Sequence, residues 1–161
     1  MTIKRLEAIH NFLKLSDHIA TAGQPSEEQF TAIKEAGYQT VVNLAPPGST
    51  NAIPHEGKIV ESLGLHYSYI PVIWTNPTFE DLDRFFLIMN ENAEKPVFVH
   101  CAKNMRVSAF MYLYRRLHDR WDDQQVEPDL HKIWIPNQTW QTFIQRVIQH
   151  YPSEASRHLI S

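Results

Sequence analysis

One segment constrains this chain more than any other part: the stretch from Val97 to Arg106, which reads VFVHCAKNMR. It joins a β-branched and aromatic run to a His-Cys pair and an arginine, and a helix-like stretch follows over residues 107–117. This order predicts a strand, a short loop and the N-terminus of a helix. Such a loop directs backbone N–H groups and the positive end of a helix dipole at one point. The segment is therefore a candidate anion site.

Cys101, the single cysteine of the chain, lies in this loop. A lone cysteine is more often an inert buried hydrophobe than a nucleophile. Here Arg106 follows within the same loop, and a guanidinium holds two oxygens of a phosphate or sulfate in a bidentate fork while a thiolate attacks the central atom. The adjoining helix N-terminus also favours the thiolate. We therefore interpret Cys101 as a nucleophile and Arg106 as an anion clamp.

The segment resembles the signature of the cysteine-dependent protein phosphatases, which reads His-Cys, five residues, Arg and then Ser or Thr. Here four residues separate Cys101 from Arg106, so either the loop is one residue shorter or the arginine stands one place early. Ser108 keeps the spacing from the cysteine at which the phosphatases carry a hydroxyl that stabilises the leaving thiolate. Asn104 stands where the family has a glycine, and asparagine is the non-glycine residue that most readily adopts a left-handed backbone.

The resemblance extends beyond the loop. It reaches the dual-specificity phosphatases and a bacterial group labelled phosphatase-like or sulfurtransferase-like, some of whose members are fused to a metallo-β-lactamase-type hydrolase domain. The segments that carry it lie within roughly residues 16–118 and are Thr21–Ser26, Thr40–Leu44, Tyr69–Val72, Pro77–Leu82 and Lys95–Val99. The resemblance implies an α/β phosphatase-like fold with a phosphate-binding loop (P-loop), no cofactor, and a phosphorylated small molecule or phosphoprotein as the partner.

The resemblance also implies roles for the residues of the loop. The reaction expected is hydrolysis of phosphomonoesters through a cysteinyl-phosphate intermediate on Cys101. The histidine before the nucleophile orients the loop by hydrogen bonding, so His100 has a supporting role that keeps the cysteine as a thiolate. The residues that correspond to the phosphate-binding positions are Ala102, Lys103, Asn104, Met105 and Arg106.

A general acid is the remaining part of the phosphatase reaction. In the family a carboxylic acid on a loop after an upstream strand protonates the leaving oxygen, which accelerates the reaction by ~10²–10⁴. The corresponding loop, residues 73–77, contains no Asp or Glu. Three carboxylates, Glu80, Asp81 and Asp83, begin the following helix, where they also suit the helix dipole and solvent. Asp81 is the candidate acid, because it lies near the helix N-terminus and can turn back toward the loop.

Apolar runs alternate with amphipathic stretches along the chain. The predicted strands are 40–44, 66–72 and 97–100, and the predicted helices are 26–36, 54–63, 78–92 and 107–117. Helices between consecutive strands favour the α/β class, with a central, largely parallel sheet flanked by helices and a ligand crevice at the strand C-termini. Residues 122–125 read as a connection between helices, and residues 140–148 as part of a closing helix. We interpret residues 1–161 as one domain.

Charge and composition exclude several functions. The chain has 18 acidic and 15 basic residues and a net charge of −3. It therefore lacks the excess of positive charge that is typical of proteins that bind nucleic acid or an anionic membrane. One cysteine suits a reducing compartment, and no run approaches the ~20 apolar residues of a membrane span, so we expect a cytoplasmic protein. The nine histidines show no zinc-type spacing, so no metal is expected. The sequence leaves the oligomeric state open.

Two other functions fit the same loop. Rhodanese-type sulfurtransferases carry a shorter cysteine loop at the end of a strand, matching the length from Cys101 to Arg106. They form a persulfide and need no general acid. The placement of Ser108 and the flanking segments favours the phosphatase. The third function is a non-catalytic module that binds a phosphorylated ligand with Arg106 and the loop amides.

Overall fold

The computed structural model describes the backbone of residues 2–160 and the side chains of residues 4–150. Its strands form one five-stranded sheet in the order β1-β2-β5-β3-β4. Their bounds are β1 Leu13–Lys14, β2 Ile19–Ala22, β3 Thr40–Asn43, β4 His66–Tyr69 and β5 Val97–His100. The first strand pairs antiparallel with β2, and all other pairs are parallel. The α/β prediction with a central, largely parallel sheet is confirmed.

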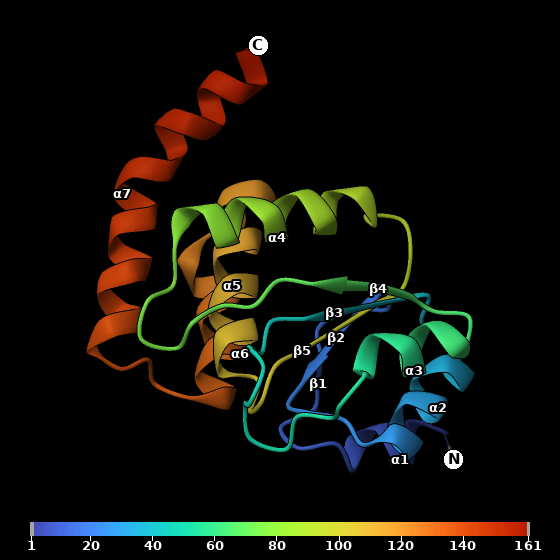
Figure 1. The fold of residues 1–161 in the computed structure, drawn as a ribbon. Coiled ribbons are helices and arrows are strands. Elements are labelled where there is room, and N and C mark those ends of the chain that lie inside the picture. Colours follow the sequence, from blue (N-terminus) through green and yellow to red (C-terminus); the bar gives the residue numbers. More distant parts are fainter. Residues whose placement is uncertain (1, 161) are drawn as a thin grey trace.

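Helices cover both faces of this sheet (Figure 1). Their bounds are α1 Thr2–Glu7, α2 Glu27–Glu35, α3 Glu56–Ser62, α4 Phe79–Glu91, α5 Met105–Leu113, α6 Asp123–Ile133 and α7 Gln138–Ile160, with a π-helical turn at Tyr114–His118. The first three helices pack on one face and α4, α5 and α7 on the other. The chain changes face between β4 and β5, and β5 inserts between β2 and β3. A sheet of this kind binds ligands at the C-terminal end of such a switch point.

The alternation of side chains along β3 and β5 divides the core into two clusters. Val41 and Phe98 face α1, α2 and α3, whereas Val42 and Val99 face α4, α5 and α7. All residues of both strands are buried. Two-sided burial explains why the apolar residues of each strand are consecutive and do not alternate with polar ones.

Local signals fix several helix ends where the sequence predicted them. Ser26 caps α2 in a capping box with Gln29, and Gly37 follows this helix with φ +98°. The Thr78 side chain caps α4 by accepting a hydrogen bond from the backbone N–H of Asp81. The helices predicted from residues 26 and 78 are therefore confirmed.

One connection was predicted wrongly. Residues 122–125 are the start of α6: the Asp122 side chain accepts from the Gln125 backbone N–H, and the Gln125 side chain accepts from the Asp122 backbone N–H. This capping box is a helix-start signal, and polar residues at a helix start resemble those of a loop. The closing helix over residues 140–148 is confirmed within α7, with Trp140 fully buried.

Among the described residues, no helix is long and apolar enough to cross a lipid bilayer. The described residues also contain no group of three or more His, Cys, Asp or Glu side chains arranged to hold a metal ion.

Candidate active site

The loop between β5 and α5 forms part of the wall of a cavity of about 410 Å³. Cys101 follows β5 directly, and α5 begins at Met105. The rest of the wall comes from the segment after β3 and from the loop before α4. The lining residues are Gly48, Ser49, Thr50, Trp74, Cys101, Ala102, Lys103, Met105 and Arg106. The predicted nucleophile and the predicted anion clamp therefore share one cavity.

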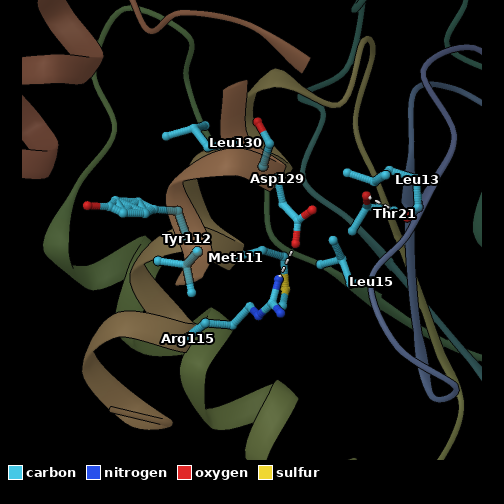
Figure 2. A pocket seen from close by; sticks show the side chains of 10 residues that line it. Leu13, Leu15, Thr21, Met111, Tyr112, Arg115, Asp129 and Leu130 are labelled. Atoms are coloured by element: carbon cyan, nitrogen blue, oxygen red, sulfur yellow. Dashed lines mark hydrogen bonds and ion pairs between the residues drawn. The ribbon is translucent and has the colours of Figure 1, made fainter. Parts of the chain in front are cut away.

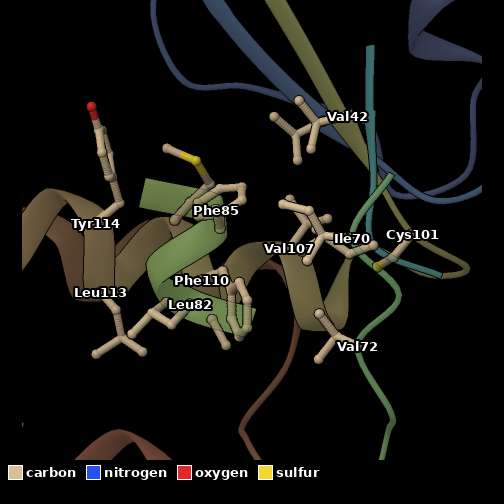
Figure 3. Packing of buried hydrophobic residues seen from close by; sticks show 14 of the residues in the cluster. Val42, Ile70, Val72, Leu82, Phe85, Cys101, Val107, Phe110, Leu113 and Tyr114 are labelled. Atoms are coloured by element: carbon tan, nitrogen blue, oxygen red, sulfur yellow. The ribbon is translucent and has the colours of Figure 1, made fainter. Parts of the chain in front are cut away.

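The Cys101 side chain is 1% exposed and lies at the margin of the apolar core. Ile70, Val72 and Val107 belong to the same buried cluster (Figure 3). Because Cys101 also lines the cavity, this residue lies where the apolar core meets the cavity wall. A reacting molecule has to enter the cavity to reach it.

Arg106, in the first turn of α5, is 8% exposed. Its Nη1 donates a hydrogen bond to the Val72 carbonyl oxygen over 3.1 Å, and its guanidinium carbon lies 5.7 Å from the centre of the Trp74 ring. Its Nε is buried and has no hydrogen-bond partner among the described residues. A buried N–H without an acceptor costs ~1–3 kcal/mol, so this side chain is held in place at a cost in stability.

Two consecutive carbonyl groups of the loop are held by donors outside it. His100 Nδ1 lies 3.2 Å from the Cys101 carbonyl oxygen, and the Gln24 backbone N–H donates to the Ala102 carbonyl oxygen over 3.0 Å. In a planar trans peptide the carbonyl and the following N–H point in opposite directions. The N–H groups of Ala102 and Lys103 therefore point away from His100 and Gln24, and both residues line the cavity.

Asn104 has the predicted left-handed backbone, with φ 66° and ψ 4°. Its side chain is fully buried, and Nδ2 donates to the Asn11 carbonyl oxygen and to Thr21 Oγ1, each over 2.9 Å. Asn11 Nδ2 in turn donates to the Lys103 carbonyl oxygen over 2.9 Å. Asn104 thus ties the loop to β2 and the N-terminal segment, and its side chain does not line the cavity.

Behind the loop, the buried carboxylate of Glu56 accepts hydrogen bonds from three side chains. His100 Nε2 lies 2.8 Å and the Tyr67 hydroxyl 3.0 Å from Oε2, and Gln24 Nε2 lies 2.6 Å from Oε1. Sequence reasoning missed Glu56, because an acidic residue in a helix's first turn is equally typical of a solvated position. Only the tertiary structure identifies Glu56, through the contact of its carboxylate with His100, the histidine before the predicted nucleophile.

Charge and hydrogen bonding act together in this cluster. Burial raises the pKa of Glu56, but the hydrogen bond and charge of His100 and the hydrogen bonds of Gln24 and Tyr67 outweigh it, so the pKa lies below its usual value. Burial and the neighbouring Glu56 carboxylate raise the pKa of Tyr67. Each ring nitrogen of His100 lies within hydrogen-bonding distance of an oxygen, so the imidazole is held from both sides.

We expect the free energy of unfolding to fall as the pH drops below the ordinary glutamate value of 4.5. The folded chain holds Glu56 at a lower pKa than the unfolded chain does, so the unfolded chain binds the proton first. The stabilisation is full above 4.5 and is lost as the pH falls toward the folded-state pKa. Urea unfolding between about pH 3 and about pH 7 measures this. Glu56→Gln should show the shallower pH dependence, and equal slopes would contradict the assignment.

The Ser108 hydroxyl is engaged away from the cavity. Its Oγ donates to the Met105 carbonyl oxygen over 2.8 Å and accepts from Trp134 Nε1 over 3.0 Å. In an α-helix each residue is rotated by about 100° from the one before, so a serine two places after Arg106 faces a different side from one directly after it. Ser108 is not among the residues that line the cavity with Cys101. It anchors Trp134, whose ring packs 5.3 Å from that of Trp74.

The loop over residues 73–77 contributes Trp74 to the cavity. Asp81, the acid candidate, lies in the first turn of α4, where its backbone N–H donates to Thr78 Oγ1 over 3.0 Å. Asp81 is not among the residues that line the cavity. Of the side chains that the structure describes, no carboxylate shares the cavity lining with Cys101.

Two of the hollows outside this site differ strongly in size. One, of about 10 Å³, has room for about one water molecule and is lined in part by the ion pair of Arg115 and Asp129, whose atoms lie 2.8 Å apart (Figure 2). The other, of about 520 Å³, adjoins the active-site cavity and shares Gly48 and Ser49 with it. Cys101 lines neither hollow.

Comparison with known proteins points to phosphatases. A family profile described as a DSP-PTPase phosphatase fused to NAD⁺ kinase matches residues 7–147. A beta-lactamase hydrolase-like protein of Xylella fastidiosa is 28% identical over 116 residues, which are 70% of this chain and 27% of that protein. A protein of the same description from Agrobacterium fabrum is 28% identical over 119 residues. The chain thus spans about 27% of the length of these curated relatives.

Solved structures agree with the fold. A phosphatase-like DUF442 protein of Shewanella putrefaciens CN-32 is 35% identical, with a TM-score of 0.83 and coverage of 92% of this chain and 98% of that one. The core catalytic domain of the PP-IP phosphatase SIW14 from S. cerevisiae is 19% identical, with a TM-score of 0.70 and coverage of 85% of each chain. At this lower identity the likeness concerns the fold alone.

Proposed function

The chain belongs to the family of DSP-PTPase phosphatases, and on this premise we propose that it hydrolyses phosphomonoesters through a cysteinyl-phosphate intermediate on Cys101. The observation that carries the proposal is that Cys101 and Arg106 line one cavity, together with a second cation, Lys103. A guanidinium beside a cysteine suits an anion that the sulfur attacks.

The reaction has two displacements at phosphorus. The Cys101 thiolate forms an S–P bond as the ester P–O bond breaks, and the leaving oxygen keeps the bonding electron pair and takes a proton from solvent. A water molecule then attacks phosphorus, loses a proton to solvent and breaks the S–P bond, which releases inorganic phosphate and restores the thiolate. Arg106 and the N–H groups of the loop stabilise the charge on the phosphoryl oxygens in both steps.

The roles of the neighbouring residues follow from their contacts. Lys103 and Arg106 are the cations in the cavity lining, which suits a phosphorylated small molecule or a phosphoprotein as substrate. His100 supports the loop through the Cys101 carbonyl oxygen. Ser108 acts indirectly: its hydroxyl holds Trp134, and the Trp134 ring packs against Trp74 of the loop that lines the cavity. No cofactor or metal is needed for this chemistry.

We expect a tetrahedral oxyanion to bind between Arg106 and the N–H groups of Ala102 and Lys103. Crystals soaked in phosphate or vanadate should show it within hydrogen-bonding distance of the guanidinium, because these donors have few competing acceptors. A protein crystallised without added oxyanion is the control. Soaked crystals with an unoccupied loop whose amides point to separate sides would contradict the proposal.

A rhodanese-type persulfide reaction is the second candidate. It is favoured by the four-residue spacing from Cys101 to Arg106 and by the lack of a carboxylate among the described cavity-lining residues. Two assays separate the candidates. A phosphatase releases p-nitrophenol from p-nitrophenyl phosphate, whereas a sulfurtransferase forms thiocyanate from thiosulfate and cyanide. A module that only binds phosphate does neither.

A further inference from the structure

We propose that Glu56 is the positioning residue of the phosphate-binding loop, because it holds both groups that fix the peptide planes after Cys101 and Ala102. The proposal rests on the function proposed above and adds a residue to it. Glu56 does not line the cavity that contains the sulfur, so it acts through His100 and Gln24.

The first connection passes through His100. Glu56 Oε2 lies 2.8 Å from His100 Nε2, and His100 Nδ1 lies 3.2 Å from the Cys101 carbonyl oxygen. The imidazole is fully buried, and the Phe30 ring packs against it at 5.8 Å in an edge-on arrangement. Rotation of the imidazole would break both polar contacts at once. Glu56 therefore fixes the direction in which the Cys101 carbonyl points. Because the next N–H of the same peptide plane points the opposite way, it also fixes the direction of the Ala102 N–H.

The second connection passes through Gln24. Its Nε2 donates to Glu56 Oε1 over 2.6 Å, while its backbone N–H donates to the Ala102 carbonyl oxygen over 3.0 Å. One residue thus joins the carboxylate to the next peptide plane of the loop. The direction of the Lys103 N–H depends on this contact in the same way.

The position of Glu56 in the chain adds a third connection. It is the first residue of α3, and the segment that leads to it contributes Gly48, Ser49 and Thr50 to the cavity wall. The carboxylate therefore also links this segment to the loop around Cys101. A buried hydrogen-bonded carboxylate is a strong tie, because a neutral amide in its place offers one acceptor oxygen to three donors.

The test compares Glu56→Gln with Glu61→Gln, which removes the same charge at an exposed position of the same helix. We expect Glu56→Gln to lower kcat/KM for p-nitrophenyl phosphate by ~10², because displacement of a reacting group by about 1 Å has an effect of that order. Phosphate binding, measured by calorimetry in the Cys101→Ser background, should weaken about tenfold as the loop N–H groups lose their fixed direction. Glu61→Gln should match the unsubstituted protein in both measurements.

If Glu56 only stabilised the fold, folded Glu56→Gln would lose stability and keep its activity. Tyr67→Phe serves as a comparison, because it removes a hydrogen bond to the same carboxylate but leaves the contacts of Glu56 with His100 and Gln24. We expect Tyr67→Phe to lower the unfolding temperature with a much smaller loss of kcat/KM than Glu56→Gln. Activities are compared at temperatures where urea titrations show each variant fully folded. If folded Glu56→Gln keeps the activity and phosphate affinity of Glu61→Gln, the proposal is overturned.

A second variant covers the case in which Glu56→Gln does not fold. Gln24→Met keeps the side-chain length and the backbone N–H but removes the donor to Glu56, and we expect a loss of activity between those of the two glutamate variants. Unchanged activity in Gln24→Met would overturn the proposal. If the unsubstituted protein neither hydrolyses p-nitrophenyl phosphate nor binds phosphate, the proposed function itself fails, which is a separate outcome.

Discussion

Replacement of Cys101 by serine should reduce the hydrolysis of p-nitrophenyl phosphate by ~10⁴ or more and leave phosphate binding nearly unchanged. A serine hydroxyl is nearly the same size as the thiol but is a weak nucleophile without an activating base. The anion donors, Arg106 and the loop amides, remain in place. Steady-state kinetics measure the first effect, and calorimetric titration with inorganic phosphate measures the second.

Arg106→Lys is the matched comparison, since it keeps the charge and removes the planar fork. We expect it to weaken phosphate binding and to lower kcat/KM by ~10²–10³, the size seen when one donor to a developing oxyanion is lost.

Because Cys101 is the single cysteine, no second thiol can replace it. Hydrolysis in Cys101→Ser at more than about a tenth of the original rate would show that the reaction bypasses the sulfur.

The parts of the fold that local chemistry determines were predictable from sequence. The capping residues Ser26 and Thr78 and the apolar runs of β3 and β5 gave helix starts and buried strands close to their observed bounds. The short strands β1 and β2 were not predicted. A two-residue strand such as β1 carries no periodicity, and its pairing with β2 depends on tertiary contacts.

The candidate site was predictable where neighbouring residues build it. Cys101 and the left-handed Asn104 lie in one short loop and Arg106 in the first turn of the helix that follows, and their placement in the structure follows from the strand-loop-helix order. The hydrogen bonds of the Ser108 hydroxyl to Met105 and Trp134 could not be read from its spacing to Cys101, because they depend on the helix and on the packing of Trp134. The link between Glu56 and the loop is set by the packing of separate elements, which no local pattern contains.

The absence of Asp and Glu from residues 73–77 leads to the last prediction, which concerns the leaving group. With no carboxylate among the described cavity-lining residues, the leaving oxygen departs with its negative charge, so the rate should depend steeply on the pKa of the leaving alcohol. Aryl phosphates with acidic phenols should be hydrolysed, and alkyl phosphates such as phosphoserine should be nearly inert. Rates across a series of substituted phenyl phosphates measure this slope.

Asp81→Asn is the decisive variant in the same series, because Asp81 is the general acid that the sequence predicts. We expect it to change the rates by less than about threefold for every leaving group, since the side chain does not line the cavity. Asp83→Asn, the same change in the same helix, is the control. A flat dependence on the leaving group together with a drop of ~10² or more in Asp81→Asn would show that this carboxylate reaches the site and supplies the proton. The loop that carries Trp74 would then have to move toward Cys101 when substrate binds.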